Sequence, residues 1–205
     1  MADNIPLVIT LWETYGSNME AVAEKLAAEL GVPLHKQAYS SEAIEAASEK
    51  REKEGALGVL LRNMSSAYVM PDGRPSSTGA AIEHSYVQLA EENKGIVLAE
   101  AAQGGVLQGR NGQFLLRDRP NTLHVKLDGP VEARVAHAAS ASGISLERAR
   151  KRQKLEDQFR AEMSEKTYHF DPRDNSHYDV VVNGAGLPVD GVVAIIKAAL
   201  KAKLG

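Results

Sequence analysis

Short strand-like runs and helical repeats follow one another along the chain. Residues 7–11 form an apolar run rich in β-branched side chains, which is typical of a buried strand. Apolar side chains then recur at helical spacing from Met19 to Leu30, and Gly31 supplies a helix stop. The same signals predict four further strands, over residues 32–36, over 105–109, within 119–130 and over 178–184.

Helical patterns fill most of the chain between these strands. We expect helices after the capping serines 40 and 41 as far as Gly55, over about 80–93, over 96–102, over 131–141, from the cap-like Ser145 to about residue 170, and over 188–204. Residues 55–68 are compatible with helix or strand, and residues 69–79 form the clearest loop. The segment "GIVLAE" resembles a strand by itself, but the alanines that follow it favour the helix over 96–102.

Alternating strands and helices predict an α/β fold: a single domain with a five-stranded parallel sheet covered on both faces. A length of 205 residues and a hydrophobic content of 43% suit one such domain with a real core. Ligands bind such sheets beyond the carboxyl ends of the strands. The tight turn at Gly16 lies at such an end.

Composition removes several classes of function. The formal net charge of −3 gives no global attraction to nucleic acid or to an anionic membrane. With no cysteine, disulfides, thiolate metal sites and cysteine nucleophiles are excluded. The histidines show no metal-ligand spacing, so no metal site is expected within the chain. No apolar run reaches membrane length, and we expect a soluble cytoplasmic protein.

The segment "YGSNME" has the layout of a phosphate-binding loop between a strand and a helix. Gly16 and Ser17 keep the tight turn, and Asn18 tolerates a left-handed backbone. Backbone N–H groups and the helix dipole would attract phosphate there. However, Met19 occupies the position of the usual lysine, and Glu20 follows it. An ordinary strand–turn–helix unit is the alternative interpretation.

Longer motifs resemble the cytidylate kinase-like family, a branch of the nucleoside-monophosphate kinases within the P-loop fold. The stretch "YGSNMEAVAEKLAAELGVPLHK" is similar to the family's opening, which reads Y-G-S-G-G and ends in L-A-x-x-L-G-I-P. Here Asn18 and Met19 replace the second and third glycines, and Trp12 and Glu13 replace a serine–arginine pair. "GGVLQGRNGQFLLRDRPN" resembles the central block, with Asn111 where cytidylate kinases carry an aspartate. "HYDVVVNG" resembles the closing strand.

The charged stretch after Ser145 resembles the family's lid, in which Asp157 and Arg160 match a D-x-x-R motif. Arginines that close over a transferred phosphoryl group stabilise its developing charge. Asp157 and Arg160 share one helical face, so the carboxylate could orient the guanidinium. A solvated charged helix is the alternative. Arg134 is as compatible with a structural role as with a functional one, and surface roles are favoured for Arg62 and Arg74.

The resemblance implies a P-loop NTPase-like three-layer sandwich with a small acceptor-binding insertion at about 40–98 and a helical lid at 140–175. It implies transfer of a γ-phosphoryl group from magnesium–ATP to a nucleoside monophosphate such as CMP or to another small acceptor, and it leaves a homodimer open. The implied residues are Gly16, Ser17 and Asn18 for the donor phosphates, Arg110 for the acceptor, and Arg148, Arg152, Asp157 and Arg160 for catalysis. The alternative is a catalytically inactive nucleotide-binding or protein-interaction module.

Overall fold

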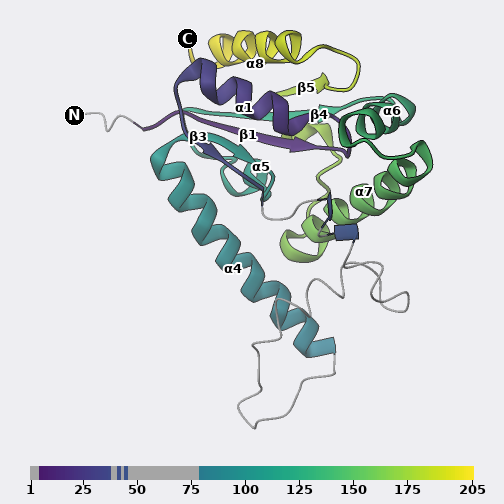
Figure 1. Cartoon of the computed structure of the whole chain (residues 1–205). Helices are drawn as coiled ribbons and strands as arrows, with labels where there is room; N and C mark the ends of the chain where they lie inside the picture. The colour runs from purple at the N-terminus through teal and green to yellow at the C-terminus, as the bar shows by residue number, and fades with distance from the viewer. Residues whose placement is uncertain (1–4, 38–40, 43, 46–78) are drawn as a thin grey trace.

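A five-stranded parallel sheet with the strand order β2-β3-β1-β4-β5 forms the centre of the protein (Figure 1). The computed structural model describes residues 5–37, 41, 42, 44, 45 and 79–205. The strands are β1 Val8–Glu13, β2 Leu34–His35, β3 Gly105–Gln108, β4 Thr122–Asp128 and β5 Val180–Asn183. The predicted α/β class and the five parallel strands are therefore confirmed.

Helices cover both faces of the sheet, as the predicted three-layer arrangement requires (Figure 1). The helices are α1 Met19–Leu30, α4 Gly79–Gln103, α5 Gly112–Leu115, α6 Val131–Ser142, α7 Leu146–Tyr168 and α8 Val189–Leu204. A 3-10 turn spans Asn175–His177. α1 and α8 lie on one face, and α4, α5 and α7 lie on the other. The β1–turn–α1 unit and the strand order are those of the P-loop kinase fold.

Strand β1 is buried along its whole length because it lies between β3 and β4. On the α1 and α8 side, Ile9 and Leu11 belong to a core cluster with Val22 and Ile196. On the opposite side, Val8 belongs to a cluster that α4 and α5 help to form. Burial of these side chains supplies the main driving force for holding the three layers together.

The sequence signals for the end of α1 and for the start of α7 are confirmed. Gly31 adopts the left-handed conformation, with φ of 64°, and its N–H closes the last turn of α1 on Ala27 and Ala28. Ser145 caps α7, because its Oγ accepts a hydrogen bond from the N–H of Arg148 at 3.2 Å.

The expected helices over 80–93 and 96–102 are one continuous helix, α4, so the predicted break is wrong. Gly95 lies inside it with no atom within 4 Å of a Cβ placed there. A glycine in a helix interior costs only about 1 kcal/mol relative to alanine, and packing offsets that cost. Val97 and Ala101 supply this packing by burying themselves against the sheet.

Several expectations fall on residues outside the described part of the chain. They are most of the helix expected up to Gly55, the ambiguous segment 55–68, the loop 69–79 apart from its last residue, and the arginines Arg62 and Arg74. The acceptor-binding insertion at about 40–98 stays a prediction; residues 46–78 lie outside the described ranges, and residues 79–98 belong to α4. Within the described ranges, no helix combines the length and the apolar character needed to cross a membrane.

Candidate functional site at the carboxyl ends of the strands

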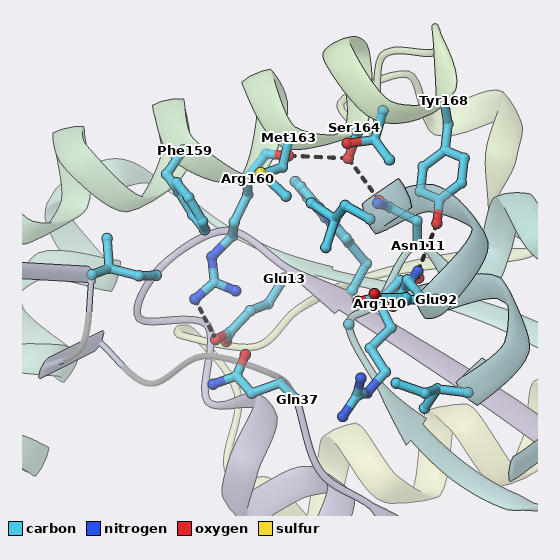
Figure 2. A pocket seen from close by; sticks show the side chains of 17 residues that line it. Glu13, Gln37, Glu92, Arg110, Asn111, Phe159, Arg160, Met163, Ser164 and Tyr168 are labelled. Atoms are coloured by element: carbon cyan, nitrogen blue, oxygen red, sulfur yellow. Dashed lines mark hydrogen bonds and ion pairs between the residues drawn. The ribbon is translucent and has the colours of Figure 1, made fainter. Parts of the chain in front are cut away.

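A cavity of about 350 Å³ opens at the carboxyl ends of β1 and β3, beneath α7 and beside α4 (Figure 2). Most of its wall is apolar: Trp12, Ile44, Leu89, Ile96, Phe159 and Met163. Charged and polar side chains also line it: Glu13, Gln37, Glu92, Asn93, Arg110, Asn111, Arg160 and Ser164. An apolar pocket with a few convergent polar groups is the usual form of a small-molecule site.

The strand register explains why β1 supplies two of these side chains. The pairing of β1 with β3 ends at Leu11 opposite Gln108. The pairing with β4 continues through Trp12 and Glu13. The last two residues of β1 therefore extend past the end of β3, where the cavity begins.

The turn after β1 has the backbone shape expected of a phosphate loop. Gly16 has φ of 82°, and a Cβ at that position would lie 2.3 Å from the carbonyl oxygen of Arg134 on α6. Asn18 is left-handed with φ of 71°, as its sequence position suggested. Ser17 is fully buried, and its Oγ lies 3.0 Å from the Oγ1 of Thr14.

Two carboxylates already bind amides of this loop. The N–H of Met19 donates to Oε2 of Glu13 at 3.1 Å. The N–H of Tyr15 donates to Oδ1 of Asp157 on α7 at 2.7 Å. Of the two glutamates near the loop, Glu13 is the one that binds an amide. Glu20 is exposed, and its Oε1 lies 3.6 Å from Nζ of Lys36. Burial raises the pKa of Glu13, although Arg160 and the Met19 N–H act in the opposite direction.

Arg160 points from α7 into the cavity, towards Glu13 (Figure 2). Its Nη2 atom lies 2.8 Å from Oε2 of Glu156 and 3.6 Å from Oε1 of Glu13. Only 13% of its side chain is exposed, and Glu156 is completely buried. The solvated charged helix considered from sequence is therefore wrong at this position, because α7 turns these charges towards the protein interior.

The predicted pairing of Asp157 with Arg160 is also different in the structure. Asp157 lies across from the loop after β1, where its Oδ2 accepts hydrogen bonds from Arg134 at 3.0 Å and from Gln153 at 2.8 Å. The carboxylate that holds Arg160 is Glu156, one helical turn before it. Asp157 therefore joins α7 to α6 and to the loop.

Arg148 and Arg152 do not line the cavity that the described residues form. Both guanidinium groups bind Glu45, with Arg148 Nη2 at 2.8 Å and Arg152 Nη2 at 2.6 Å from Oε2. These hydrogen bonds, that of Arg148 first, lower the pKa of Glu45 to about 2. The two arginines thus join α7 to the helical residues 44 and 45.

Arg110 lies just past the end of β3, as predicted, with Gly109 between them, and it lines the cavity. Its Nε lies 3.4 Å from the carbonyl oxygen of Lys36 and 3.9 Å from Oε1 of Glu100. Its own carbonyl oxygen accepts a hydrogen bond from Asn93 at 2.8 Å, which fixes the turn with φ of 57°. This position is open to a ligand at the carboxyl end of the sheet.

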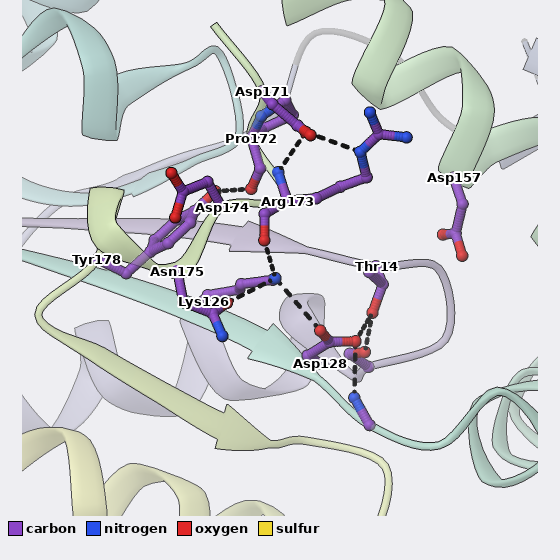
Figure 3. Close-up of polar contacts among 12 residues, drawn as sticks. Thr14, Lys126, Asp128, Asp157, Asp171, Pro172, Arg173, Asp174, Asn175 and Tyr178 are labelled. Atoms are coloured by element: carbon purple, nitrogen blue, oxygen red, sulfur yellow. Dashed lines mark hydrogen bonds and ion pairs between the residues drawn. The ribbon is translucent and has the colours of Figure 1, made fainter.

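A polar cluster around the buried Lys126, behind the loop, was not predicted from the sequence (Figure 3). Nζ of Lys126 on β4 donates to Asn175 at 2.9 Å and lies 3.3 Å from Asp128. Asp128 accepts a hydrogen bond from Thr14 at 2.8 Å. Burial opposes it, but the hydrogen bonds from Thr14 and Gly129 hold the pKa of Asp128 below its usual value. Charged residues inside an otherwise apolar strand were the signal that could have revealed this cluster.

The residues present do not fit magnesium–ATP. The position after the usual lysine, where a hydroxyl group would hold magnesium, carries Glu20, whose exposed carboxylate lies 3.6 Å from Lys36. The side chain at the lysine position is the buried Met19. Glu13 and Asp157 place negative charge on the amides that would cradle phosphates. A phosphate chain in this loop would have to displace both carboxylates.

Comparison with known proteins gives one family match. The model of the cytidylate kinase-like family matches residues 8–185. A protein named cytidylate kinase from Methanopyrus kandleri is 30% identical over 131 residues, which are 56% of this chain and 68% of that protein. A cytidylate kinase from Thermococcus kodakarensis is 32% identical over 95 residues, which are 46% of this chain and 48% of that one.

Other matches concern only part of the relative or only the fold. A protein named uronate isomerase from Corynebacterium glutamicum is 31% identical over 109 residues, and the chain spans only 21% of its length. An uncharacterized protein from Eubacterium ventriosum has a solved structure with a TM-score of 0.60 and 17% identity. That likeness covers 95% of this chain and 98% of the other, and it supports the fold alone.

Proposed function

The chain belongs to the cytidylate kinase-like family, and from that premise we propose that it is a binding protein for a small nucleoside-type molecule. The ligand would occupy the cavity at the carboxyl ends of β1 and β3. In this proposal the fold keeps the acceptor side of a phosphotransferase, while the donor loop is closed. The protein would then bind its ligand without transferring a phosphoryl group to it.

One observation carries the proposal: the Glu13 carboxylate binds the Met19 amide at 3.1 Å, at the start of α1. That amide belongs to the first turn of the helix, where an incoming phosphate would bind. A buried carboxylate there both uses the donor and repels the phosphate chain. The Asp157–Tyr15 hydrogen bond adds a second blocked amide from the opposite side.

The second candidate is the ATP-dependent phosphotransferase that the family name suggests. Arg110 and Arg160 favour it, because both line the cavity and could meet an acceptor. It would need α7 to move, since Asp157 is bonded to the loop and both Arg148 and Arg152 are bonded to Glu45. Lid movements of this kind are common in kinases.

Two measurements on the wild-type protein separate the candidates. Calorimetric titration with cytidine and with CMP, each with and without magnesium–ATP, tests ligand binding and donor binding. A coupled assay for ADP release across nucleoside and nucleoside-monophosphate acceptors tests turnover. We expect binding of a nucleoside-type molecule without ADP release. Steady ADP release that depends on one acceptor would replace the binding-protein proposal with the phosphotransferase.

A further inference from the structure

We propose that the ligand of this cavity carries no phosphate, and that Glu13 is the residue that excludes phosphorylated molecules. This inference rests on the proposed function, because it concerns the same cavity and the same nucleoside-type ligand. It states which member of that class the site accepts: the uncharged nucleoside in preference to its monophosphate.

The first argument is that acidic side chains of the protein already compensate the charge of Arg160. Its Nη2 atom is shared between Glu156 at 2.8 Å and Glu13 at 3.6 Å. Its Nε, which has no hydrogen-bond partner among the described atoms, is buried from solvent. The carboxyl groups of Glu13 and Glu156 therefore surround one guanidinium, and a phosphate brought to it would have to compete with both.

The second argument concerns Arg110, the other cation on the cavity wall. Glu100 lies 3.9 Å from its Nε, and the side chains of both residues are mostly buried. Glu92 adds a further acidic group to the wall. The acidic side chains on or beside the cavity wall are therefore at least as many as the two arginines that line it. A phosphomonoester would add negative charge where the surroundings are already acidic and poorly solvated.

The third argument is what the cavity offers in place of cations. Trp12, Phe159 and Tyr168 give it flat aromatic surfaces of the kind on which planar rings stack. Asn93 uses its amide protons on Arg110 and Tyr168, which leaves its carbonyl oxygen to accept a hydrogen bond.

Asn111 has the complementary arrangement. Its carbonyl oxygen accepts from Ser164 at 2.6 Å, which leaves its NH₂ group to donate. The cavity thus presents one amide acceptor and one amide donor, from Asn93 and Asn111, beside aromatic walls. This set matches the hydrogen-bonding edge of a neutral heterocyclic base, and no member of it calls for a phosphate.

Calorimetric titration of the full chain with cytidine, CMP, adenosine and AMP tests the inference. We expect each nucleoside to bind at least tenfold more tightly than its monophosphate. Glu13→Gln keeps the shape of the side chain and removes its charge, so we expect the preference for the nucleoside over its monophosphate to shrink about tenfold. Glu20→Gln is the matched control, since it removes an exposed charge from the same β1–α1 unit and should change neither affinity.

A series of ligands that differ only in charge tests the same point without a protein variant. The cationic 5′-amino-5′-deoxycytidine should bind at least as tightly as cytidine, and CMP should bind most weakly. If wild-type protein prefers CMP to cytidine, this inference is overturned while the proposed function stands. If neither binds, the proposed function itself fails. If cytidine is preferred but Glu13→Gln leaves the preference intact, Glu13 is not the excluding residue.

Discussion

The carboxylate of Glu13 and the guanidinium of Arg160 approach to 3.6 Å on the wall of the cavity, although they are far apart in sequence. Glu13 ends the central strand, and Arg160 lies on the helix that covers it. Glu156 completes the group from the turn before Arg160. Because these charges are buried, their mutual compensation is a condition for folding as well as a feature of the site.

Arg160→Ala should therefore destabilise the protein strongly. The substitution leaves the completely buried Glu156 and the nearly buried Glu13 without their cation. Removing one partner of a buried ion pair costs about 3–5 kcal/mol. Urea unfolding followed by circular dichroism measures the loss.

Arg150→Ala on the same helix is the matched control. Arg150 binds Glu132, and both side chains are exposed, so the loss should be far smaller than for Arg160→Ala. Equal losses for the two variants would show that the group around Arg160 is solvated in solution.

The same group shows how far sequence reasoning reaches. Periodicity predicted the strands, α7 and the place of Arg110, because these depend on local patterns. The sequence pairs Arg160 with Asp157, three residues back, whereas in the structure its partner is Glu156, four residues back. Only the packing of α7 on the loop decides between them, since it turns Asp157 towards Tyr15.

Contacts between residues far apart in sequence were the ones that could not be predicted. Arg148 and Arg152 were assigned to catalysis by their resemblance to a lid, but each is bonded to Glu45. In the sequence, Glu13 stands out only as a departure from the family's serine–arginine pair. Its role became visible only with the loop's backbone, because no spacing rule links it to the Met19 amide.

The Glu45 carboxylate should make part of the free energy of unfolding depend on pH. Its pKa is held at about 2 in the folded protein against 4.5 normally, so between these values the folded state binds fewer protons than the unfolded state. The contribution is present above about pH 4.5 and is lost as the pH falls towards 2. Its upper limit is about 3 kcal/mol.

Unfolding free energies at pH 3 and pH 6 measure this contribution. Glu45→Gln should reduce the difference between the two pH values. Glu132→Gln, at an exposed ion pair, should leave it almost unchanged. A wild-type difference that Glu45→Gln does not alter would contradict the buried pairing with Arg148 and Arg152.

Gly16→Ala should cost more than a left-handed conformation alone. Its φ of 82° disfavours any side chain, and the new Cβ would also collide with the Arg134 carbonyl oxygen. Gly143 has φ of 62° but open space around its Cβ position. We expect a loss of about 1–2 kcal/mol for Gly143→Ala and a clearly larger one for Gly16→Ala. Thermal unfolding of both variants checks the order, and equal losses would mean that α6 does not press on the loop.

Releasing the loop amides from their carboxylates should raise the affinity for a nucleoside triphosphate. Wild-type protein should bind magnesium–ATP weakly or not at all, because the amides of Tyr15 and Met19 are bound to carboxylates. Glu13→Ala frees the Met19 amide and removes one negative charge. The helix N-terminus is then available to a phosphate. We expect the affinity for magnesium–ATP to rise at least tenfold.

Asp157→Ala should free the Tyr15 amide in the same way, and the double variant should bind most tightly. The two effects need not be additive, since both act on one loop. Glu20→Gln provides the control for removal of a charge near the loop without release of an amide. Circular dichroism must show that each variant is folded before its titration is compared. Tight binding of magnesium–ATP to the wild-type protein would show that the carboxylates yield to phosphate, and the loop would then be a working donor site.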